Sequence, residues 1–214
     1  MSAMRNGWIK ILEIAIPVAL VVVGVAVFRF YIWWNKSQCV RYTRRLAAQG
    51  DPDGLNGMGV FYQEKGDHAR AVEYFSRAAE GGHAEAKALL GHCYLVGEGV
   101  EPCLPRALEL FRESAEGGSE YGQLYLADCY AEGRGVPIDA QEAVRLYELS
   151  AAQECSEAQY KLSKCFMRGI GVEMDYDHAL ELLRRAAYNL HEDAARELDE
   201  LGVPYKTLLD DEEK

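Results

Sequence analysis

The sequence predicts an all-α protein, a right-handed α-solenoid of helix-turn-helix repeats preceded by a single transmembrane helix. The segment from Leu90 to Val100 returns at 126–136 and again at 162–172, a fixed interval of thirty-six residues. Such an interval, with one helix start and one helix stop per copy, is typical of a solenoid whose units bury apolar faces against their neighbours. In addition, the run from Ile14 to Phe28 has no charged side chain. Function is therefore expected on a surface of the repeats.

Small and large apolar residues recur at fixed places in the repeat, as two crossing helices require. One column holds small residues and the other large ones: Ala71, Ala107, Ala143 and Ala179, then Phe75, Phe111, Tyr147 and Leu183. Within one unit, apolar residues spaced by three and four predict a first helix near 84–96 and a second near 104–115. The stripes are Ala86, Leu90, Cys93 and Tyr94, then Ala107, Leu110, Phe111 and Ser114. We expect both stripes to face one seam.

Two glycine columns mark the loop between the helices: Gly97, Gly133 and Gly169, then Gly99, Gly135 and Gly171. The first column stands where a helix ends in a left-handed residue, which glycine adopts without a steric penalty. The second lets the chain turn again before the next helix. These six glycines are therefore predicted to be structural.

Asp67, Asp139 and Asp175 share the place where the second helix needs an N-cap, and Glu142 stands at capping-box spacing from Asp139. Cys103 occupies this place in the remaining unit. A helix N-terminus favours a thiolate, so Cys103 is a candidate reactive cysteine. The alternative, which we favour, is a neutral substitution at a tolerant cap.

The pairing of Ala-rich helices with Leu-Gly-x-Cys-Tyr and Gly-x-Gly-Val resembles the Sel-one-like repeat family of the tetratricopeptide-repeat superfamily. The resemblance covers residues 51–201, with units of about 51–82, 83–118, 119–154 and 155–190 and a capping helix at 191–201. The first unit lacks the Gly-x-Gly-Val insertion and is closer to an ordinary tetratricopeptide unit. The resemblance implies a concave face lined by the first helices.

Residues 1–35 are predicted to form an N-terminal membrane anchor. Trp8 precedes the uncharged run, and four aromatic residues between Phe30 and Trp34 follow it, as expected at two membrane interfaces. A secretory signal peptide is the alternative, since Gly24 and Ala26 offer a small-residue cleavage site. The apolar character continues through Trp34, which favours a retained anchor.

Residues 36–50 are predicted to form a basic juxtamembrane helix. Its Arg41–Arg45 cluster is expected to rest on anionic headgroups, and the excess of basic residues after Phe28 places the repeats in the cytoplasm. A short basic N-terminus that stays inside would instead export the repeats, for example to a periplasm.

The charge is divided unevenly along the chain. Residues 1–45 carry seven basic side chains and one acidic one, so with a net charge of −11 overall the remainder carries −17. Phosphate binding requires a basic surface, so nucleic acid is not expected as a partner of the repeats. Residues 202–214 form an acidic C-terminal tail.

No catalytic, cofactor-binding or metal-binding residues are predicted. Cys93, Cys129 and Cys165 are one repeat apart, too far for disulfides, and are expected to be small buried hydrophobes. The segment from His191 to Ala195 lacks the second histidine of a zinc-protease motif. The sequence around His68, His83, His92 and His178 suggests solvated positions.

The function we expect is a non-enzymatic, membrane-anchored adaptor that binds a protein or peptide on its concave face. Carrying the family pattern over predicts one groove residue set per first helix: Asn56, Val60 and Gln63; Ala88, His92 and Leu95; Leu124, Asp128 and Ala131; Tyr160, Lys164 and Met167. His92, Asp128 and Lys164 share one column and are expected to project in parallel. Alternatives are an assembly factor that stabilises a membrane complex and, less favoured, an exported hydrolase.

Overall fold

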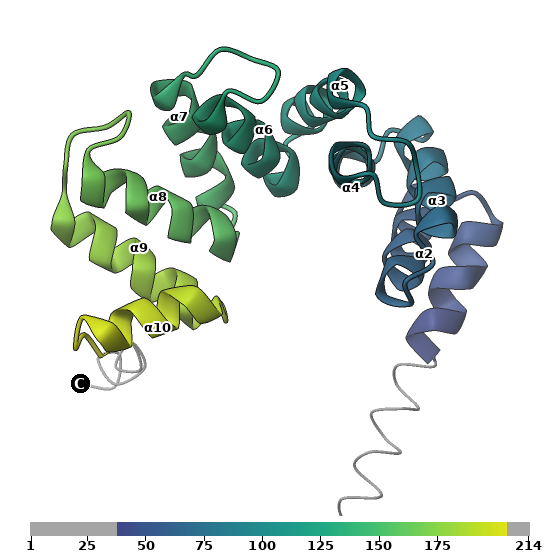
Figure 1. Ribbon diagram of the computed structural model, residues 1–214. Helices are drawn as coiled ribbons and strands as arrows, with labels where there is room; N and C mark the ends of the chain where they lie inside the picture. The colour runs from purple at the N-terminus through teal and green to yellow at the C-terminus, as the bar shows by residue number, and fades with distance from the viewer. Residues whose placement is uncertain (1–37, 205–214) are drawn as a thin grey trace, which may run out of the picture.

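The computed structural model describes residues 38–204, which form a curved stack of helices (Figure 1). A first helix spans 38–48. It is followed by α2 (Pro52–Glu64), α3 (His68–Glu80), α4 (Ala84–Val96), α5 (Leu104–Glu116), α6 (Glu120–Glu132), α7 (Ala140–Ala151), α8 (Ser156–Arg168), α9 (Tyr176–Tyr188) and α10 (Glu192–Glu200). The predicted all-helical repeat array is confirmed, and residues 38–204 contain no strand.

The helices pair as α2 with α3, α4 with α5, α6 with α7 and α8 with α9, and α10 packs on α9. In Figure 1 the pairs follow an arch, with α4 and α6 toward its inside and α5 and α7 toward its outside. None of the helices described in 38–204 is long and apolar enough to cross a membrane. The predicted anchor at 1–35 lies outside the described residues, as does most of the acidic tail.

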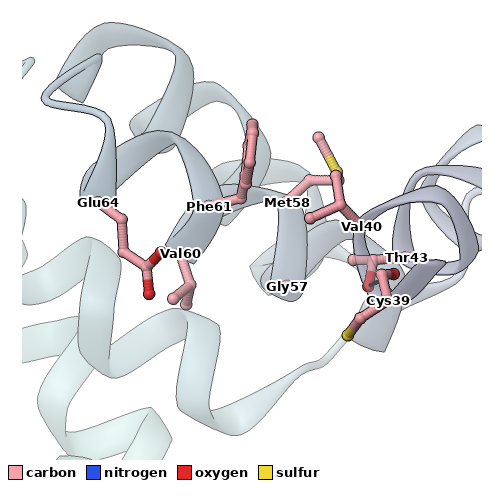
Figure 2. A pocket seen from close by; sticks show the side chains of 8 residues that line it. All are labelled: Cys39, Val40, Thr43, Gly57, Met58, Val60, Phe61 and Glu64. Carbon is pink, nitrogen blue, oxygen red and sulfur yellow. Dashed lines mark hydrogen bonds between the residues drawn. The ribbon is translucent and has the colours of Figure 1, made fainter. Parts of the chain in front are cut away.

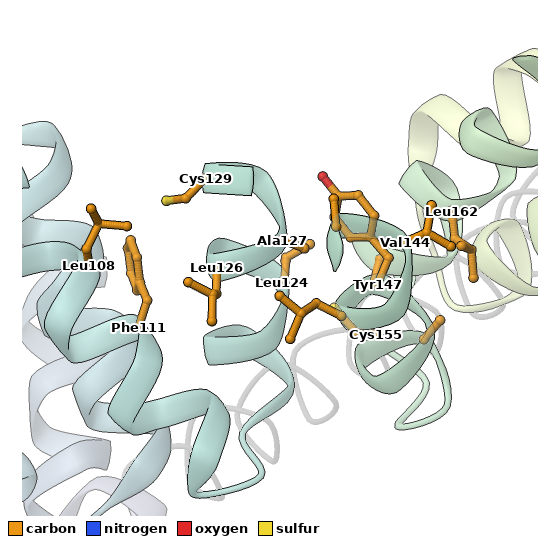
Figure 3. Packing of buried hydrophobic residues seen from close by; sticks show 14 of the residues in the cluster. Leu108, Phe111, Leu124, Leu126, Ala127, Cys129, Val144, Tyr147, Cys155 and Leu162 are labelled. Carbon is orange, nitrogen blue, oxygen red and sulfur yellow. The ribbon is translucent and has the colours of Figure 1, made fainter. Parts of the chain in front are cut away.

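The first two helix pairs, α2 with α3 and α4 with α5, each close by placing an aromatic ring on a residue without a side chain. A Cβ added to Gly91 would lie 2.7 Å from the ring of Phe111, and one added to Gly59 would lie 2.4 Å from the ring of Phe75. Both rings are fully buried. The predicted columns of alanines and large residues are therefore core positions, and Figure 3 shows how the core continues from α5 through α6 and α7 to α8.

The loop glycines behave as predicted. Gly97, Gly133 and Gly169 end their helices in the left-handed conformation. The second column is also left-handed, and at Gly99 a Cβ would lie 2.3 Å from the carbonyl oxygen of His68. This loop thus packs directly on the N-terminus of the preceding second helix, which leaves no room for a side chain.

Asp67, Asp139 and Asp175 accept hydrogen bonds from backbone amides as N-caps, which confirms the cap column. The predicted capping box at Asp139 forms in part. Asp139 accepts from the amide of Glu142 at 3.0 Å, but the Glu142 carboxylate accepts from Arg145 Nε at 2.8 Å. An i,i+3 ion pair has therefore replaced the return bond of the box.

Helix 38–48 packs on α2 as a second helix packs on the next unit. A Cβ added to Gly54 would lie 2.5 Å from the Ala47 amide nitrogen, and one added to Gly122 would lie 2.6 Å from that of Ala115. Both pairs are seven residues apart in the sequence. The described array therefore begins with a second helix and, at α10, ends with a first helix.

Candidate protein-interaction face

Successive first helices are joined by side chains from two fixed places. From α4 to α10, the ninth residue of one first helix meets the sixth residue of the next, thirty-three residues later in the chain. His92 of α4 lies against Tyr125 of α6, with ring centroids 5.2 Å apart. Asp128 pairs with Lys161 of α8, and Lys164 pairs with Glu197 of α10. The predicted row of His92, Asp128 and Lys164 is therefore present, but each member is engaged with the next unit.

Asp128 is the most heavily bonded member of this row. Its carboxylate accepts from the Tyr147 hydroxyl at 2.6 Å and from Lys161 Nζ at 2.8 Å. Burial, followed by the Asp128 charge, raises the pKa of Tyr147 far above its usual range. Burial alone would lower the pKa of Lys161, but Asp128 and then Glu157 outweigh it and raise that pKa. Asp128 thus holds α6, α7 and α8 together.

Three predicted groove residues are core residues instead. Asn56, Ala88 and Leu124 have exposed fractions of 7%, 0% and 3%. The reason is that first helices pack on one another through this place: Leu124 belongs to the same core cluster as Cys155 and Ala158 of the next unit. The assignment of these three residues to an exposed groove is therefore wrong.

The exposed stripe lies one residue further along each helix. Leu89, Tyr125 and Lys161 occupy it and are partly exposed. The other predicted groove residues are partly or fully exposed: Val60, Gln63, His92, Leu95, Asp128, Ala131, Tyr160, Lys164 and Met167. These residues belong to α2, α4, α6 and α8, and in Figure 1 the helices α4 and α6 lie toward the inside of the arch.

An aromatic group at the centre of this face was not predicted from the sequence. The rings of Tyr121 and Tyr125 stack with centroids 6.4 Å apart, beside His92. Burial, then Tyr121 and Asp128, raises the pKa of Tyr125 to about 12, so its hydroxyl is neutral at physiological pH. The spacing of Tyr121, Tyr125 and Asp128 by four and three residues was the available sequence signal.

Two histidines cap first helices, and for His83 this contrasts with the solvated position that we expected. His83 Nδ1 accepts from the Ala86 amide at 3.1 Å, and Asp53 lies 3.2 Å from its Nε2. His191 repeats this arrangement, with the Ala194 amide at 3.2 Å and Glu157 at 2.8 Å. Of the other histidines, His68 lies 3.3 Å from Glu98, and His178 meets the ring of Phe166 edge to face.

All six cysteines lie in the described part of the chain and are free. Cys93 and Cys129 are buried as predicted, and burial raises the pKa of both thiols to about 11. Cys165 is partly buried. Cys103 is exposed at the N-cap of α5 and makes no side-chain cap bond. Residues 38–204 contain no cluster of three or more His, Cys, Asp or Glu residues that could hold a metal ion.

Solved structures with the same architecture include a Sel1 repeat protein from Oxalobacter formigenes. It is 28% identical with a TM-score of 0.61, and the match covers 70% of this chain and 61% of that one. The protective antigen c5321 of uropathogenic Escherichia coli, described as having an SLR fold, is 29% identical with a TM-score of 0.63, over 74% of this chain and 35% of that one. A putative Sel1 repeat protein from Klebsiella pneumoniae shares the fold at 20% identity, with a TM-score of 0.54 over 78% and 85% of the two chains.

This chain therefore spans about three fifths of the first of these proteins and about a third of the second. No curated protein sequence matches it. The family model described as Sel1 repeat matches residues 52–83, 84–119, 120–155 and 156–189, which is more than half of the chain. These segments contain the four helix pairs from α2 to α9. The chain belongs to the Sel1 repeat family.

Proposed function

We propose that the protein is a membrane-anchored adaptor that binds a protein or peptide partner on the inner face of its arch. Sel1 repeat proteins generally serve as scaffolds for protein interactions, and they are generally not enzymes. The proposal goes further because it assigns the contact to the first helices and the site of action to a membrane surface.

The observation that carries the proposal is the partly exposed stripe on α4, α6 and α8. Tyr121, Tyr125 and His92 form an aromatic surface at its centre, and Leu89 and Leu95 add apolar area beside it. Tyrosine and other aromatic side chains are over-represented among residues that dominate binding energy in protein interfaces. Asp128 and Lys161 neutralise one another here, so we expect apolar and aromatic contact to supply most of the affinity.

The proposed membrane attachment combines the uncharged run before residue 28 with helix 38–48. Arg41, Arg44 and Arg45 of that helix are exposed, as an electrostatic contact with anionic headgroups requires. The helix packs directly on α2, so the array would be held near the bilayer with limited swing. The excess of basic residues after the apolar run favours a cytoplasmic array.

The test of the binding face is partner capture by the full chain from native membranes. Tyr121→Ser combined with Leu89→Ala should lose the captured partners, while the helical circular dichroism spectrum stays the same. Tyr176→Ser is the matched control, because Tyr176 is an exposed tyrosine at the start of α9. Unchanged capture by the Tyr121 and Leu89 variant would exclude this face as the binding site. Loss of capture only when the anchor is replaced would favour an assembly factor that makes its contact within the membrane.

A further inference from the structure

A cavity of about 400 Å³ adjoins the aromatic surface, at the N-terminal ends of α4 and α6. Tyr121, whose ring stacks on that of Tyr125, lines this cavity, so the aromatic surface continues into it. Glu85 of α4 and Glu120 of α6 line it as well. The groove between helix 38–48 and α2 has a different character, because its lining contains one charged residue and is mostly apolar (Figure 2). The cavity beside Tyr121 therefore combines an aromatic ring with two carboxylates, and we call it the acidic cavity.

The repeat register shows how the acidic cavity departs from the other joints. Most first helices have an acidic second residue. At two joints this carboxylate meets the histidine that caps the next first helix, with oxygen–nitrogen distances of 3.2 and 2.8 Å: Asp53 with His83, and Glu157 with His191. Glu85 holds the same place on α4, but the N-cap of α6 is Ser119, which supplies no cation. Glu85 therefore lacks the partner that its column has at these two joints.

Glu120 places a second carboxylate where the histidine is missing. Both glutamates are partly buried, and neither carboxylate has an ion pair or a hydrogen bond within residues 38–204. Burial, followed by the charge of Glu85, raises the pKa of Glu120. The helix dipole favours an acidic residue in the first turn, but it does not require two of them to share one cavity. Partial burial of a charge costs free energy until a countercharge offsets it, so an added cation would stabilise this site.

We propose that the acidic cavity receives a lysine or arginine side chain of the protein or peptide that binds the aromatic surface. The two carboxylates supply the opposite charge, and the Tyr121 ring supplies a face on which a cation can rest. The inference rests on the proposed function, because one partner contacts both the aromatic surface and the cavity. Apolar contact supplies most of the affinity, and the basic side chain selects the partner and fixes its position.

The charge of the whole array also fits a basic partner. The sequence after residue 45 carries a net charge of −17, against −11 for the entire chain. Such a field speeds the approach of a basic partner and disfavours an acidic one. A metal ion fits the site less well, because residues 38–204 contain no group of three or more His, Cys, Asp or Glu residues that could ligate one.

The test pans a random twelve-residue peptide library, displayed on phage, against the full-length protein in detergent. Enriched peptides are synthesised with a fluorescent label, and Kd is measured by fluorescence anisotropy. Tyr121→Ser combined with Leu89→Ala identifies the peptides that need the aromatic surface, because these peptides lose binding to that variant. We expect each of them to contain a lysine or arginine beside apolar residues.

Glu85→Gln combined with Glu120→Gln should raise the Kd of these peptides about tenfold or more, as for close charge pairs in other interfaces. Replacing the basic residue of the peptide with glutamine should have the same effect on the wild type and little further effect on the double variant. The matched control is Glu148→Gln combined with Glu181→Gln, which changes the net charge equally at exposed positions on α7 and α9. Its Kd should change by less than about twofold at physiological salt.

The outcomes separate this inference from the proposed function. Peptides that need the aromatic surface but contain no basic residue, or whose Kd is unchanged by Glu85→Gln with Glu120→Gln, would overturn the inference alone. Equal losses for the control pair would also overturn it, because they indicate general attraction to an acidic protein. An oligomer that Glu85→Gln with Glu120→Gln dissociates would overturn it in favour of a second copy's Arg41–Arg45 cluster. If no enriched peptide depends on Tyr121 and Leu89, the proposed function fails and the inference fails with it.

Discussion

Asp128→Ala tests whether the carboxylate between α6, α7 and α8 holds the array together. The substitution leaves the Tyr147 hydroxyl without its acceptor, although that side chain is buried. An unsatisfied buried hydroxyl costs about 1–3 kcal/mol. Lys161 loses one carboxylate but keeps Glu157 at 3.3 Å, so the charge pair adds about 1 kcal/mol or less. We expect the free energy of unfolding to fall by about 2–3 kcal/mol.

For a domain of this size, a loss of that order lowers the melting temperature by about 5–10 °C. Thermal denaturation followed by circular dichroism measures the change. Glu113→Ala is the control, because Glu113 pairs with Lys87 across helices at 2.6 Å but is 42% exposed. Its effect should be about 1 kcal/mol or less.

A double-mutant cycle with Tyr147→Phe separates the hydrogen bond from other effects of losing the carboxylate. Tyr147→Phe should cost about 0.5–1.5 kcal/mol alone and much less in the Asp128→Ala background. Additive losses, or a melting temperature for Asp128→Ala equal to that of Glu113→Ala, would refute the assignment of Asp128 as the joint between the three helices.

Four further outcomes are expected. The pKa values of Tyr125 and Tyr147 are raised in the folded state, so the stability that they contribute is present below pH ~10 and lost as the pH rises toward 12. Between pH 8 and 11.5 the melting temperature of Tyr125→Phe should therefore fall less steeply than that of the wild type, and identical slopes would contradict this. Leu190 has a φ of 65° and is 89% exposed, so Leu190→Gly should stabilise the protein by about 0.5–1 kcal/mol in urea unfolding; Glu154→Gly, at the equivalent left-handed residue, should not, because Glu154 binds Gln159, Arg185 and Asn189. Gly133→Val should destabilise by more than about 1 kcal/mol, since Gly133 has a φ of 73° and a Cβ would lie 2.8 Å from Ile138, and an unchanged melting temperature would argue against this helix end. Finally, Cys103 should be alkylated before Cys93 and Cys129 at neutral pH, because Cys103 is exposed whereas burial raises the pKa of the other two thiols to about 11; the reverse order would contradict the burial of those two residues.

The repeat period was sufficient to predict most of the fold. Residues such as Gly97, Phe111 and Asp139 have one role each, set by local geometry, and the same role returns in most of the units. The inner face was harder to predict because its exposure depends on how successive first helices rotate against each other. That rotation buries Leu124 and exposes Tyr125, one residue later. The spacing of apolar residues within one helix does not show how the helix is rotated against its neighbour.

The histidine caps were missed for a related reason. His83 and His191 each accept a cap bond from the amide three residues later, but the side-chain partner of the other ring nitrogen is distant in the sequence. Each depends on a carboxylate from the preceding unit, Asp53 or Glu157, which only the stacked array brings within reach. Side chains whose role lies between units are thus the ones that a repeat pattern leaves undetermined.

The joints between first helices also make the order of the units specific. One joint is aromatic, between His92 and Tyr125, while the next two are ion pairs whose polarity reverses from Asp128–Lys161 to Lys164–Glu197. Deletion of residues 120–155 would preserve the period, yet it would place His92 opposite Lys161 and leave that ammonium without Asp128. Exchange of two units would create similar mismatches. Although the backbone is modular, shuffled arrays of these same units should therefore be less stable than the natural order.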